Sequence, residues 1–414
     1  MRIVLWHGYL LGGTGSNVYS RALAREWSLA GHDVTVVCQE RVPEQFDLGG
    51  ARVVVPDLPG GLLPVFVMDR YAGLEPKLLQ EWTDAEKAAY VDANGAAIRA
   101  QLPADIVFTN HVLMGAPVGV ASGAPFRVKA HGSELEYSMR GRSELEAWGR
   151  ETLAQAELTF VGSDHIRNVL REVTGHTERV REVPPGVDVD EFVPEERDAA
   201  LAQLIAEARS DPPNPGNTEE RLPDEGNAAR LAEFLAGGEP TVVYFGKLIE
   251  QKGVQVLLDA MRAVDARLVV VGFGPYRAAL EGLAPPRTLF TGPLEHRHLR
   301  HLLALADATV VPSIFPEAFG MVAAEAASAG SPPLVSRHSG LAEVAAGLEE
   351  EYPAKAKQLA SFETGNAADL AAKLNELLAL PAADRAAVRA AARDAVVKNW
   401  SWASVAIRLL APAG

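Results

Sequence analysis

Short apolar runs recur along the chain and alternate with longer stretches in which apolar residues are spaced three or four apart. A short continuous apolar run is typical of a strand that is buried on both faces, whereas the longer spacing is typical of an amphipathic helix. Regular alternation of the two predicts parallel sheets that helices cover on both sides. The sequence therefore predicts an α/β fold.

The first series of apolar runs predicts six strands, which are Ile3–Trp6, Val34–Cys38, Val53–Val55, Ile106–Thr109, Phe126–Ala130 and Leu158–Val161. Helical patterns separate these runs, and the longest belongs to a helix between Pro76 and Gln101. A helix from about Ser16 to Ala30 ends at Gly31, a residue type that commonly follows the last turn of a helix. This part of the chain is expected to form one doubly wound, Rossmann-like domain.

A second series predicts the strands Thr241–Phe245, Leu268–Val271, Thr288–Phe290, Thr309–Val311 and Pro333–Ser336. The intervening helices are expected at about Val254–Val264, Pro275–Leu283, Glu295–Ala306 and Phe319–Ala329. A further helix, at about Ala382–Lys398, leads into Trp400 and Trp402, which are expected to anchor the tail on another surface. A second doubly wound domain follows from this pattern.

A chain of 414 residues exceeds what one hydrophobic core normally supports. The segment Val183–Asp190 is rich in turn-forming residues and suits a hinge. We therefore expect an N-terminal domain at 1–185, with the tail 399–414 packing back on it, and a C-terminal domain at 186–398. The two Rossmann-like domains are expected to face each other across a cleft.

Composition narrows the class of protein. Hydrophobic residues make up 48% and charged residues 22% of the chain, and its net charge of −15 argues against nucleic acid as a partner. No apolar stretch approaches the roughly 18 residues of a membrane-spanning helix, and Ile3–Trp6 is too short for a signal peptide. Cys38 is the only cysteine. These features predict a cytoplasmic protein without disulfides.

Nearly half of the net negative charge lies between Glu195 and Glu239, where eleven acidic residues face four arginines. Aromatic residues are scarce there, and prolines interrupt the segment. We expect a mobile insertion at about 195–239, with short helices at its ends, that does not belong to a core.

Two glutamates eight residues apart, Glu317 and Glu325, follow the predicted strand Thr309–Val311. Pro316 disfavours a helix just before it, so Glu317 is expected in a loop and Glu325 inside the next helix. A carboxylate can accept two adjacent hydrogen bonds, which suits the vicinal diol of a sugar or a ribose. The alternative is that both are ordinary surface and helix glutamates.

Lys247 and Lys252 follow the strand Thr241–Phe245, and Lys252 precedes Gly253 at the start of a helix. Ligands of open parallel sheets bind beyond the carboxyl ends of the strands, and two ammonium groups at that place would neutralise a diphosphate. The glycine loop that contains Gly274 also follows a strand, but it lacks the full nicotinamide fingerprint. Surface lysines on an ordinary loop are the alternative.

His131 ends a predicted strand and is followed by Gly132 and Glu134. At the carboxyl end of a strand, this histidine could donate a hydrogen bond to a sugar hydroxyl. The turn after the first strand contains Gly12 and Gly13, which would let backbone approach a ligand. No histidine spacing typical of a metal site is found in the sequence, so no metal cofactor is expected.

Together these motifs resemble the retaining GT-B glycosyltransferases of family 4, and the resemblance extends over nearly the whole chain. Its elements are the Glu-x7-Glu pair Glu317 and Glu325, the phosphate clamp Gly246–Leu248 with Lys252-Gly253, the loop Gly12-Gly13, the element His131–Glu134 and the hinge Pro185–Asp188. The resemblance implies a nucleotide-diphosphate sugar, linked to uridine or guanosine, as donor.

The resemblance also implies roles for individual residues. Glu317 would hold hydroxyls of the donor sugar, Glu325 the ribose diol and His131 the donor sugar on its acceptor side. The remaining donor-binding residues are expected to be Lys247, Lys252, Gly274, Phe319, Gly320 and Gly13. Three features depart from the family pattern: Lys247 replaces the usual arginine, the helix after Glu317 is rich in alanine, and the 195–239 insertion is additional.

Other classes of protein remain open at this point. They are another enzyme with the same fold, such as a nucleotide-sugar epimerase or a phosphorylase, a catalytically silent nucleotide-sugar-binding protein, and a nicotinamide oxidoreductase. The acidic charge and the lack of a basic amphipathic helix favour a soluble acceptor over a membrane lipid.

Overall fold

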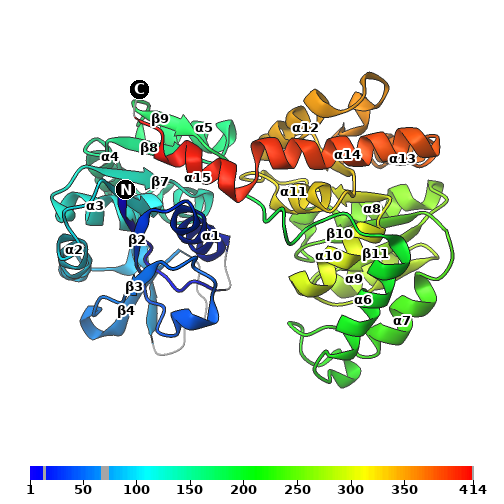
Figure 1. The fold of residues 1–414 in the computed structure, drawn as a ribbon, viewed down its shortest axis with the longest axis horizontal. Helices are drawn as coiled ribbons and strands as arrows, with labels where there is room; N and C mark the ends of the chain where they lie inside the picture. The colour runs from blue at the N-terminus through cyan, green and yellow to red at the C-terminus, as the bar shows by residue number, and fades with distance from the viewer. Residues whose placement is uncertain (13–14, 67–73, 413–414) are drawn as a thin grey trace. The chain divides into compact units, whose positions relative to one another are not determined.

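A computed structural model describes residues 1–12, 15–66 and 74–412 of the chain. The chain folds into two compact units (Figure 1). The first unit contains Met1–Gly186 and the segment from Val405 onward, and the second contains Val187–Ser404. Near the C-terminus the chain returns to the first unit at Val405. The sequence had predicted this return at position 399, a few residues earlier.

The first unit is built on a seven-stranded parallel sheet in the order β3-β2-β1-β6-β7-β8-β9. The strands are β3 (Arg52–Val54), β2 (Asp33–Val37), β1 (Arg2–Trp6), β6 (Ile106–Asn110), β7 (Phe126–Lys129), β8 (Leu158–Val161) and β9 (Val180–Glu182). A separate parallel pair joins β4 (Leu62–Val65) to β5 (Glu75–Leu78). Because β1 lies between β2 and β6, the winding direction of the sheet reverses beside β1, and ligand sites form at such points.

The helices of the first unit are α1 (Gly15–Leu29), α2 (Asp84–Arg99), α3 (Ala116–Ser122), α4 (Ser143–Leu153) and α5 (Asp164–Thr174), with single turns η1 (Pro43–Gln45), η2 (Pro59–Gly61), η3 (Leu79–Glu81), η4 (His111–Gly115) and η5 (Glu134–Met139). The helix predicted between Pro76 and Gln101 is α2, which begins at Asp84. The Thr83 and Glu86 side chains each bond the other's backbone N–H, and this capping box sets the start of α2.

The second unit contains a six-stranded parallel sheet in the order β12-β11-β10-β13-β14-β15. Its strands are β12 (Thr288–Phe290), β11 (Arg267–Val271), β10 (Thr241–Phe245), β13 (Ala308–Val311), β14 (Pro333–Ser336) and β15 (Ser361–Phe362). Here the winding reverses between β10 and β13, so the loops that follow these two strands start side by side. Val242 of β10 pairs with Ala308 of β13.

The helices of the second unit are α6 (Arg197–Arg209), α7 (Asn227–Phe234), α8 (Val254–Ala260), α9 (Arg277–Leu283), α10 (His296–Leu305), α11 (Met321–Ser328), α12 (Ser339–Glu351), α13 (Ala367–Leu378) and α14 (Ala382–Asn399). Short turns are η6 (Pro215–Asn217), η7 (Glu250–Lys252), η8 (Met261–Ala263) and η9 (Ala354–Leu359). Helix α15 (Trp402–Leu410) begins in the second unit and ends in the first.

The expectation that the 195–239 insertion does not belong to a core is wrong. Helix α6 buries Ala200 and Leu204, and α7 buries Leu231, within the hydrophobic core of the second unit. The many acidic residues concealed apolar side chains that recur at helical spacing. Helix α6 packs against α10.

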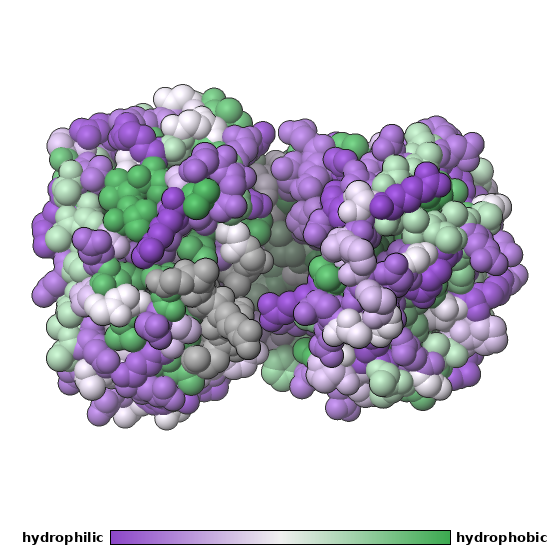
Figure 2. All heavy atoms as spheres, turned by 90° about the horizontal axis from the view of Figure 1, so that it is seen from below, coloured by the Kyte–Doolittle hydropathy of each residue, from purple (hydrophilic) through white to green (hydrophobic). Residues whose placement is uncertain are grey.

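The molecular surface is largely hydrophilic in the view of Figure 2, with apolar side chains scattered over it. Ile314 and Phe315, in the loop after β13, are among the large apolar side chains that stay exposed. An exposed isoleucine and phenylalanine at the carboxyl end of a central strand are available to a ligand.

Candidate functional site

Two loops of the second unit meet at the carboxyl ends of β10 and β13, where the winding of the sheet reverses. Lys252, in η7, forms an ion pair with Glu317 from the loop after β13. The Ser313 hydroxyl donates a hydrogen bond of 2.6 Å to the same Oε1 atom of Glu317. The Lys252 and Glu317 side chains remain 31% and 22% exposed, so a ligand can reach both charges.

Glycine lets the two loops approach this closely. Gly253 has a φ of 68°, and a Cβ atom there would lie 1.9 Å from the carbonyl oxygen of Pro312. The Ile314 N–H donates to the Gln251 carbonyl at 3.0 Å and joins the loops beside it. Any larger residue at 253 would push the lysine loop away from the glutamate loop.

A brace that the sequence analysis did not identify holds the glutamate loop. His338 Nε2 lies 2.7 Å from the Ser313 carbonyl oxygen, and its Nδ1 lies 2.9 Å from the Ser339 hydroxyl. That hydroxyl accepts the Glu317 N–H at 2.9 Å. A carbonyl oxygen only accepts, so Nε2 carries the ring proton, and in the neutral ring Nδ1 accepts from Ser339.

The backbone of Ser339 supports a functional interpretation of this brace. Its φ of 46° lies in the left-handed region, which costs free energy for a residue with a side chain. The N–H of Gly340 donates to the Glu317 carbonyl at 3.0 Å, so this strained turn fixes the loop at both ends of one residue. The turn at the start of α12 therefore positions Glu317.

The other two predicted charges do not join the Lys252–Glu317 pair directly. Lys247 is exposed, and in the described part of the chain its ammonium group forms no ion pair. Its carbonyl oxygen accepts the Tyr244 hydroxyl at 2.8 Å. Glu325 lies in α11, where burial raises the pKa of its carboxyl to about 7, an effect that His296 opposes and Glu191 reinforces.

The predicted loop residues have different environments. Gly274 (φ 151°) approaches the Leu248 carbonyl so closely that a Cβ atom would lie 2.4 Å away. Gly320 also needs its glycine conformation, with a φ of 138°. Phe319 is buried and packs edge-to-face on Trp400, with ring centroids 5.6 Å apart. Gly13 lies outside the described residues.

The first unit carries a group of three histidines at the same edge of its sheet, of which His7 and His111 are buried and His131 is partly buried. His7 follows β1, His111 follows β6 and His131 follows β7, and all three lie close together. His131 Nε2 lies 3.0 Å from the side-chain oxygen of Asn110. Glu134 accepts the N–H groups of His131 and of Val112, at 3.1 and 2.7 Å, and so connects β7 to the π-helical turn η4.

Burial favours the neutral forms of His7 and His131. Loss of hydration and the neighbouring His111 lower the pKa of His7 to about 3. The same two causes, with Lys129 and His7 in addition, hold the pKa of His131 well below its ordinary range. Burial also lowers the pKa of Lys129 to about 7. The amide oxygen of Asn110 only accepts, so the one N–H of neutral His131 is on Nε2, and Nδ1 is left as an acceptor.

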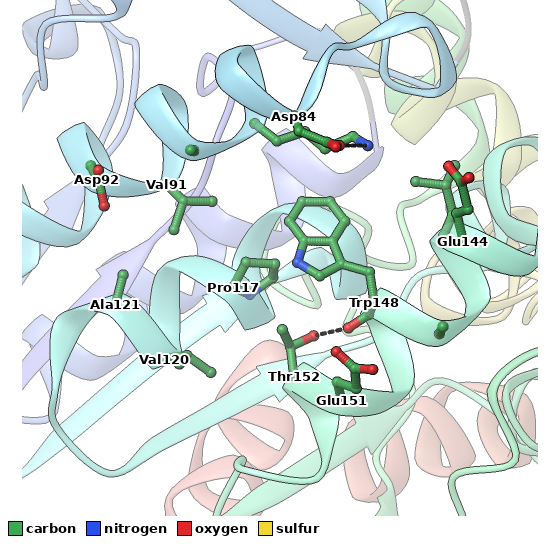
Figure 3. Close-up of a pocket in the computed structure, with 14 residues that line it drawn as sticks. Asp84, Val91, Asp92, Pro117, Val120, Ala121, Glu144, Trp148, Glu151 and Thr152 are labelled. Carbon is green, nitrogen blue, oxygen red and sulfur yellow. Dashed lines mark hydrogen bonds and ion pairs between the residues drawn. The ribbon is translucent and has the colours of Figure 1, made fainter.

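The first unit also has a groove of about 700 Å³ that lies away from these residues, among α2, α3 and α4 (Figure 3). Trp148 lies along it, Lys87 sits over the Trp148 ring at 5.8 Å from the centroid, and Lys87 also pairs with Asp84. None of the residues predicted from the sequence lines this groove.

Two further searches covered only the residues that the structure describes. They contain no group of three or more histidine, cysteine, aspartate or glutamate side chains placed to hold a metal ion. None of their helices is both long and apolar enough to cross a membrane.

Comparisons with known proteins find family matches in both units of the chain. Residues 13–191 match the family described as Glycosyltransferase Family 4, and residues 228–395 match Glycosyl transferases group 1. A GDP-mannose-dependent alpha-(1-6)-phosphatidylinositol monomannoside mannosyltransferase of Mycobacterium tuberculosis is 29% identical over 70% of this chain and 69% of its own length. A GDP-mannose-dependent monoacylated alpha-(1-6)-phosphatidylinositol monomannoside mannosyltransferase of Corynebacterium glutamicum is 26% identical over 72% of this chain and 72% of its own length.

Solved structures support the fold. HepE of Anabaena in complex with UDP and glucose superimposes with a TM-score of 0.67, covering 99% of this chain and 98% of that one, at 15% identity. The two-domain α/β architecture predicted from the sequence, GT-B, is thereby confirmed. The chain belongs to the group 1 glycosyltransferases of family 4.

Proposed function

We propose that this glycosyltransferase moves a hexose from a nucleotide-diphosphate sugar to a hydroxyl of an acceptor, with retention of anomeric configuration and without a metal ion. The observation that supports it best is the exposed Lys252–Glu317 pair at the point where the sheet of the second unit reverses its winding. A cation and an anion in contact there offer separate partners to a diphosphate and to sugar hydroxyls.

Different polar groups of the second unit would bind different parts of the donor. Lys252, together with the exposed Lys247 on the same loop, would bind the diphosphate. The carboxylate of Glu317, already oriented by Ser313, would accept hydrogen bonds from the sugar. Glu325 would accept hydrogen bonds from the ribose diol.

Lysine charge would also stabilise the leaving group. The bond between the anomeric carbon and the donor phosphate oxygen breaks, and negative charge grows on the nucleoside diphosphate beside the ammonium groups. The acceptor oxygen bonds to the anomeric carbon on the face that the phosphate leaves, and the acceptor proton passes to the departing phosphate oxygen. In this scheme no protein nucleophile is needed, and neutral His131, whose Nε2–H donates to Asn110, would accept a hydrogen bond from a sugar hydroxyl at Nδ1.

The relatives suggest which donor and acceptor to test first. Two of them are named as dependent on GDP-mannose, so GDP-mannose is the leading donor. Their names also specify phosphatidylinositol mannosides as acceptors, whereas the acidic charge of this chain favours a soluble acceptor. Both acceptor classes belong in one assay.

The test is a donor panel followed by product analysis. Thermal shift with GDP-mannose, GDP-glucose, UDP-glucose and UDP-galactose should select one donor, since a ligand at 100 times its Kd adds about 2.7 kcal/mol of stability. The selected donor is then incubated, with EDTA present, with mannosylated inositol or its phosphatidyl form, and the anomeric proton of the product is measured by NMR.

Each outcome separates the alternatives. Acceptor-dependent release of nucleoside diphosphate with a retained anomer supports the proposal. Conversion of the donor sugar without an acceptor identifies an epimerase, and binding without turnover for every acceptor identifies a silent binding protein. Loss of activity in EDTA, restored by a divalent cation, contradicts the metal-independent mechanism.

A further inference from the structure

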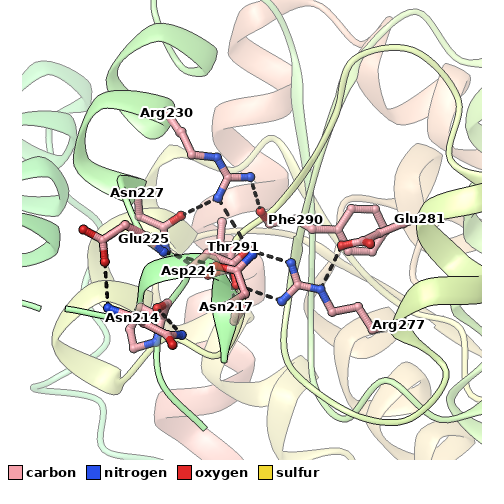
Figure 4. Close-up of polar contacts among 12 residues, drawn as sticks. Asn214, Asn217, Asp224, Glu225, Asn227, Arg230, Arg277, Glu281, Phe290 and Thr291 are labelled. Atoms are coloured by element: carbon pink, nitrogen blue, oxygen red, sulfur yellow. Dashed lines mark hydrogen bonds and ion pairs between the residues drawn. The ribbon is translucent and has the colours of Figure 1, made fainter. Parts of the chain in front are cut away.

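The insertion at 195–239 reaches the carboxyl ends of β11 and β12. The N–H of Asp224 and the side-chain amide of Asn227 both donate to the Thr291 carbonyl, at 2.9 and 2.8 Å. Arg230 donates to the Phe290 carbonyl at 2.6 Å. Three insertion residues therefore bond the last residue of β12 and the one after it (Figure 4).

Asp224 also connects to the strand beside it. The Arg277 guanidinium donates two hydrogen bonds to the Asp224 carboxylate, at 2.8 and 2.6 Å, and Arg277 opens helix α9 just after the β11 loop. The Asp224 side chain is only 2% exposed. A buried carboxylate paired in this bidentate way holds its partner in one orientation.

These contacts continue into the lysine loop. The Gly272 N–H, at the end of β11, donates to the Gly292 carbonyl at 3.0 Å, and the Tyr276 N–H donates to the Leu248 carbonyl at 3.0 Å. Leu248 follows Lys247, so the β11 loop contacts the segment that carries both lysines. A Cβ atom on Gly292 would lie 2.7 Å from Asp224 Oδ1, which leaves no room between the carboxylate and the β12 loop.

The segment after β12 leads into α10, whose first residue is His296. The charge of His296 acts to lower the pKa of Glu325, the glutamate assigned to the ribose. His296 comes five residues after Thr291, the residue that Asp224 and Asn227 hold. A nucleoside bound at Glu325 would therefore lie beside the segment that runs from the end of β12 to α10.

Asp224 is itself fixed by the fold of the insertion. The buried Asn214 side chain donates to the carbonyls of Glu219 and Pro223, each at 3.1 Å. The Glu225 carboxylate accepts the Asn214 N–H at 2.6 Å and closes the turn (Figure 4). The residues before it are tied to α10, because Arg297 pairs with Asp211 at 2.5 Å.

We propose that Asp224 is a positioning residue of the donor site: by holding Arg277 through its carboxylate and Thr291 through its N–H, it fixes the loops after β11 and β12 in the form that binds the nucleoside part of the donor. This inference rests on the proposed function. It also gives the insertion a role, since the insertion supplies the rigid support for one wall of the nucleotide site.

The experiment measures GDP and UDP binding by isothermal titration calorimetry on the full chain. Asp224→Asn keeps the shape of the side chain but removes its charge, and Arg277→Gln breaks the same pair from the partly exposed side. In each variant the Kd for the nucleotide that binds wild type should rise about three- to thirtyfold. Asp224 also pairs with Arg230, so Asp224→Asn removes the Arg277 pair and one more contact. The double variant should therefore bind no more weakly than Asp224→Asn alone, because Arg277→Gln removes nothing further from Asp224.

A matched control and a kinetic comparison separate positioning from stability. Arg389→Gln removes another partly buried guanidinium of the second unit, one that bonds the Ala304 and Ala306 carbonyls before β13. It should lower Tm without changing nucleotide Kd. For Asp224→Asn, the donor KM should rise while kcat at saturating donor and the acceptor KM stay within about twofold of wild type.

Three results would overturn these assignments in distinguishable ways. Unchanged Kd in folded Asp224→Asn overturns the inference alone. Equal weakening in Arg389→Gln also overturns it, because the effect is then general destabilisation. If wild type binds neither GDP nor UDP, the proposed donor site itself fails, and the inference fails with it.

Discussion

The two sheets of this protein carry polar groups at equivalent edges, but those groups differ in charge and exposure. In the first unit, His7 and His111 are buried and His131 is partly buried, and the pKa of His7 and that of His131 are lowered. In the second unit, Lys252 and Glu317 form an ion pair that solvent reaches. The same topology thus supports one edge that carries uncharged histidines and another that carries a charged pair.

The difference follows from how each edge is filled. Aromatic side chains surround the histidines, and Phe66 and Tyr9 both contact the His111 ring. The lysine and glutamate loops instead meet through glycine and serine, which leave the charges accessible. We infer that the first edge orients uncharged hydroxyls and that the second edge holds the charged part of the donor.

Lys252→Ala is the most severe test of this comparison. Removing the ammonium group should lower kcat/KM for the donor about 100- to 1,000-fold, because charge on the leaving diphosphate loses a preorganised partner. Steady-state kinetics with the selected donor measures this. Lys398→Ala, which breaks an exposed pair with Glu351, serves as control and should match wild type. Near-normal kinetics for Lys252→Ala would remove the charged edge from the mechanism.

His131→Ala should have a smaller effect, because a neutral hydrogen bond is weaker than a charged contact. We expect kcat to fall about tenfold with little change in nucleotide Kd. Because the pKa of His131 is lowered, His131 does not titrate near pH 6.5. Any step near pH 6.5 in the pH–rate profile of the wild type should therefore remain in the variant. His176→Gln, in the same unit, is the matched histidine control. A loss of such a step on replacing His131 would show that this edge carries charge after all.

His338→Ala tests whether the Lys252–Glu317 pair also depends on the hydrogen bonds that His338 forms with the Glu317 loop. Without the ring, the Ser313 carbonyl and the Ser339 hydroxyl lose their common partner, and Glu317 gains freedom. We expect kcat/KM for the donor to fall about three- to tenfold, with part of the activity restored by His338→Asn. His301→Gln, which breaks a pair with Glu195, should leave kcat/KM unchanged.

The smallest predicted effect is a pair of opposite pH trends in stability. His7 has a pKa of about 3 in the folded chain against an ordinary 6.5. As pH drops from 6.5 toward 3, the unfolded chain binds a proton at His7 and the folded chain does not, so the stability of the folded chain falls. Glu325 has a folded pKa of about 7 against an ordinary 4.5, so its contribution becomes less favourable as pH rises from 4.5 to 7.

Calorimetry of two variants can resolve these trends. His7→Gln should reduce the acid sensitivity of the first unit. Glu325→Gln should raise the Tm of the second unit above pH 7 but not near pH 4.5, by a few degrees on a scale of about 2–4 °C per kcal/mol. Parallel pH curves for either variant and wild type would contradict the corresponding assignment.

Much of the fold could be predicted because continuous apolar runs mark buried parallel strands. Strand β10 was predicted with the bounds that it has, Thr241–Phe245. The sequence analysis was less exact about where helices begin. It placed a helix between Pro76 and Gln101, and α2 lies there, but its start after β5 is set by the local pair Thr83 and Glu86.

The site was predictable where the chemistry lies in charged residues after a strand, as for Lys252 and Glu317. His338, Ser339 and Asp224 were missed because they act through backbone carbonyls and N–H groups, which leave no periodic pattern. A usable signal for His338 is its position, since it follows β14 directly, as His131 follows β7. Asp224 offers no such signal, because its partners lie in α9 and after β12.

The C-terminal segment has a consequence for how the protein is made. Trp27 donates to the Ala406 carbonyl at 3.0 Å, and the buried Arg127 donates to the Leu409 carbonyl at 2.9 Å. Nascent chains fold as they leave the ribosome, N-terminal segments first. The earliest-translated unit of this chain can pair the Arg127 guanidinium with Glu157, but the Leu409 carbonyl that accepts from it arrives only with α15. The final maturation of the first unit therefore waits for translation of the whole second unit.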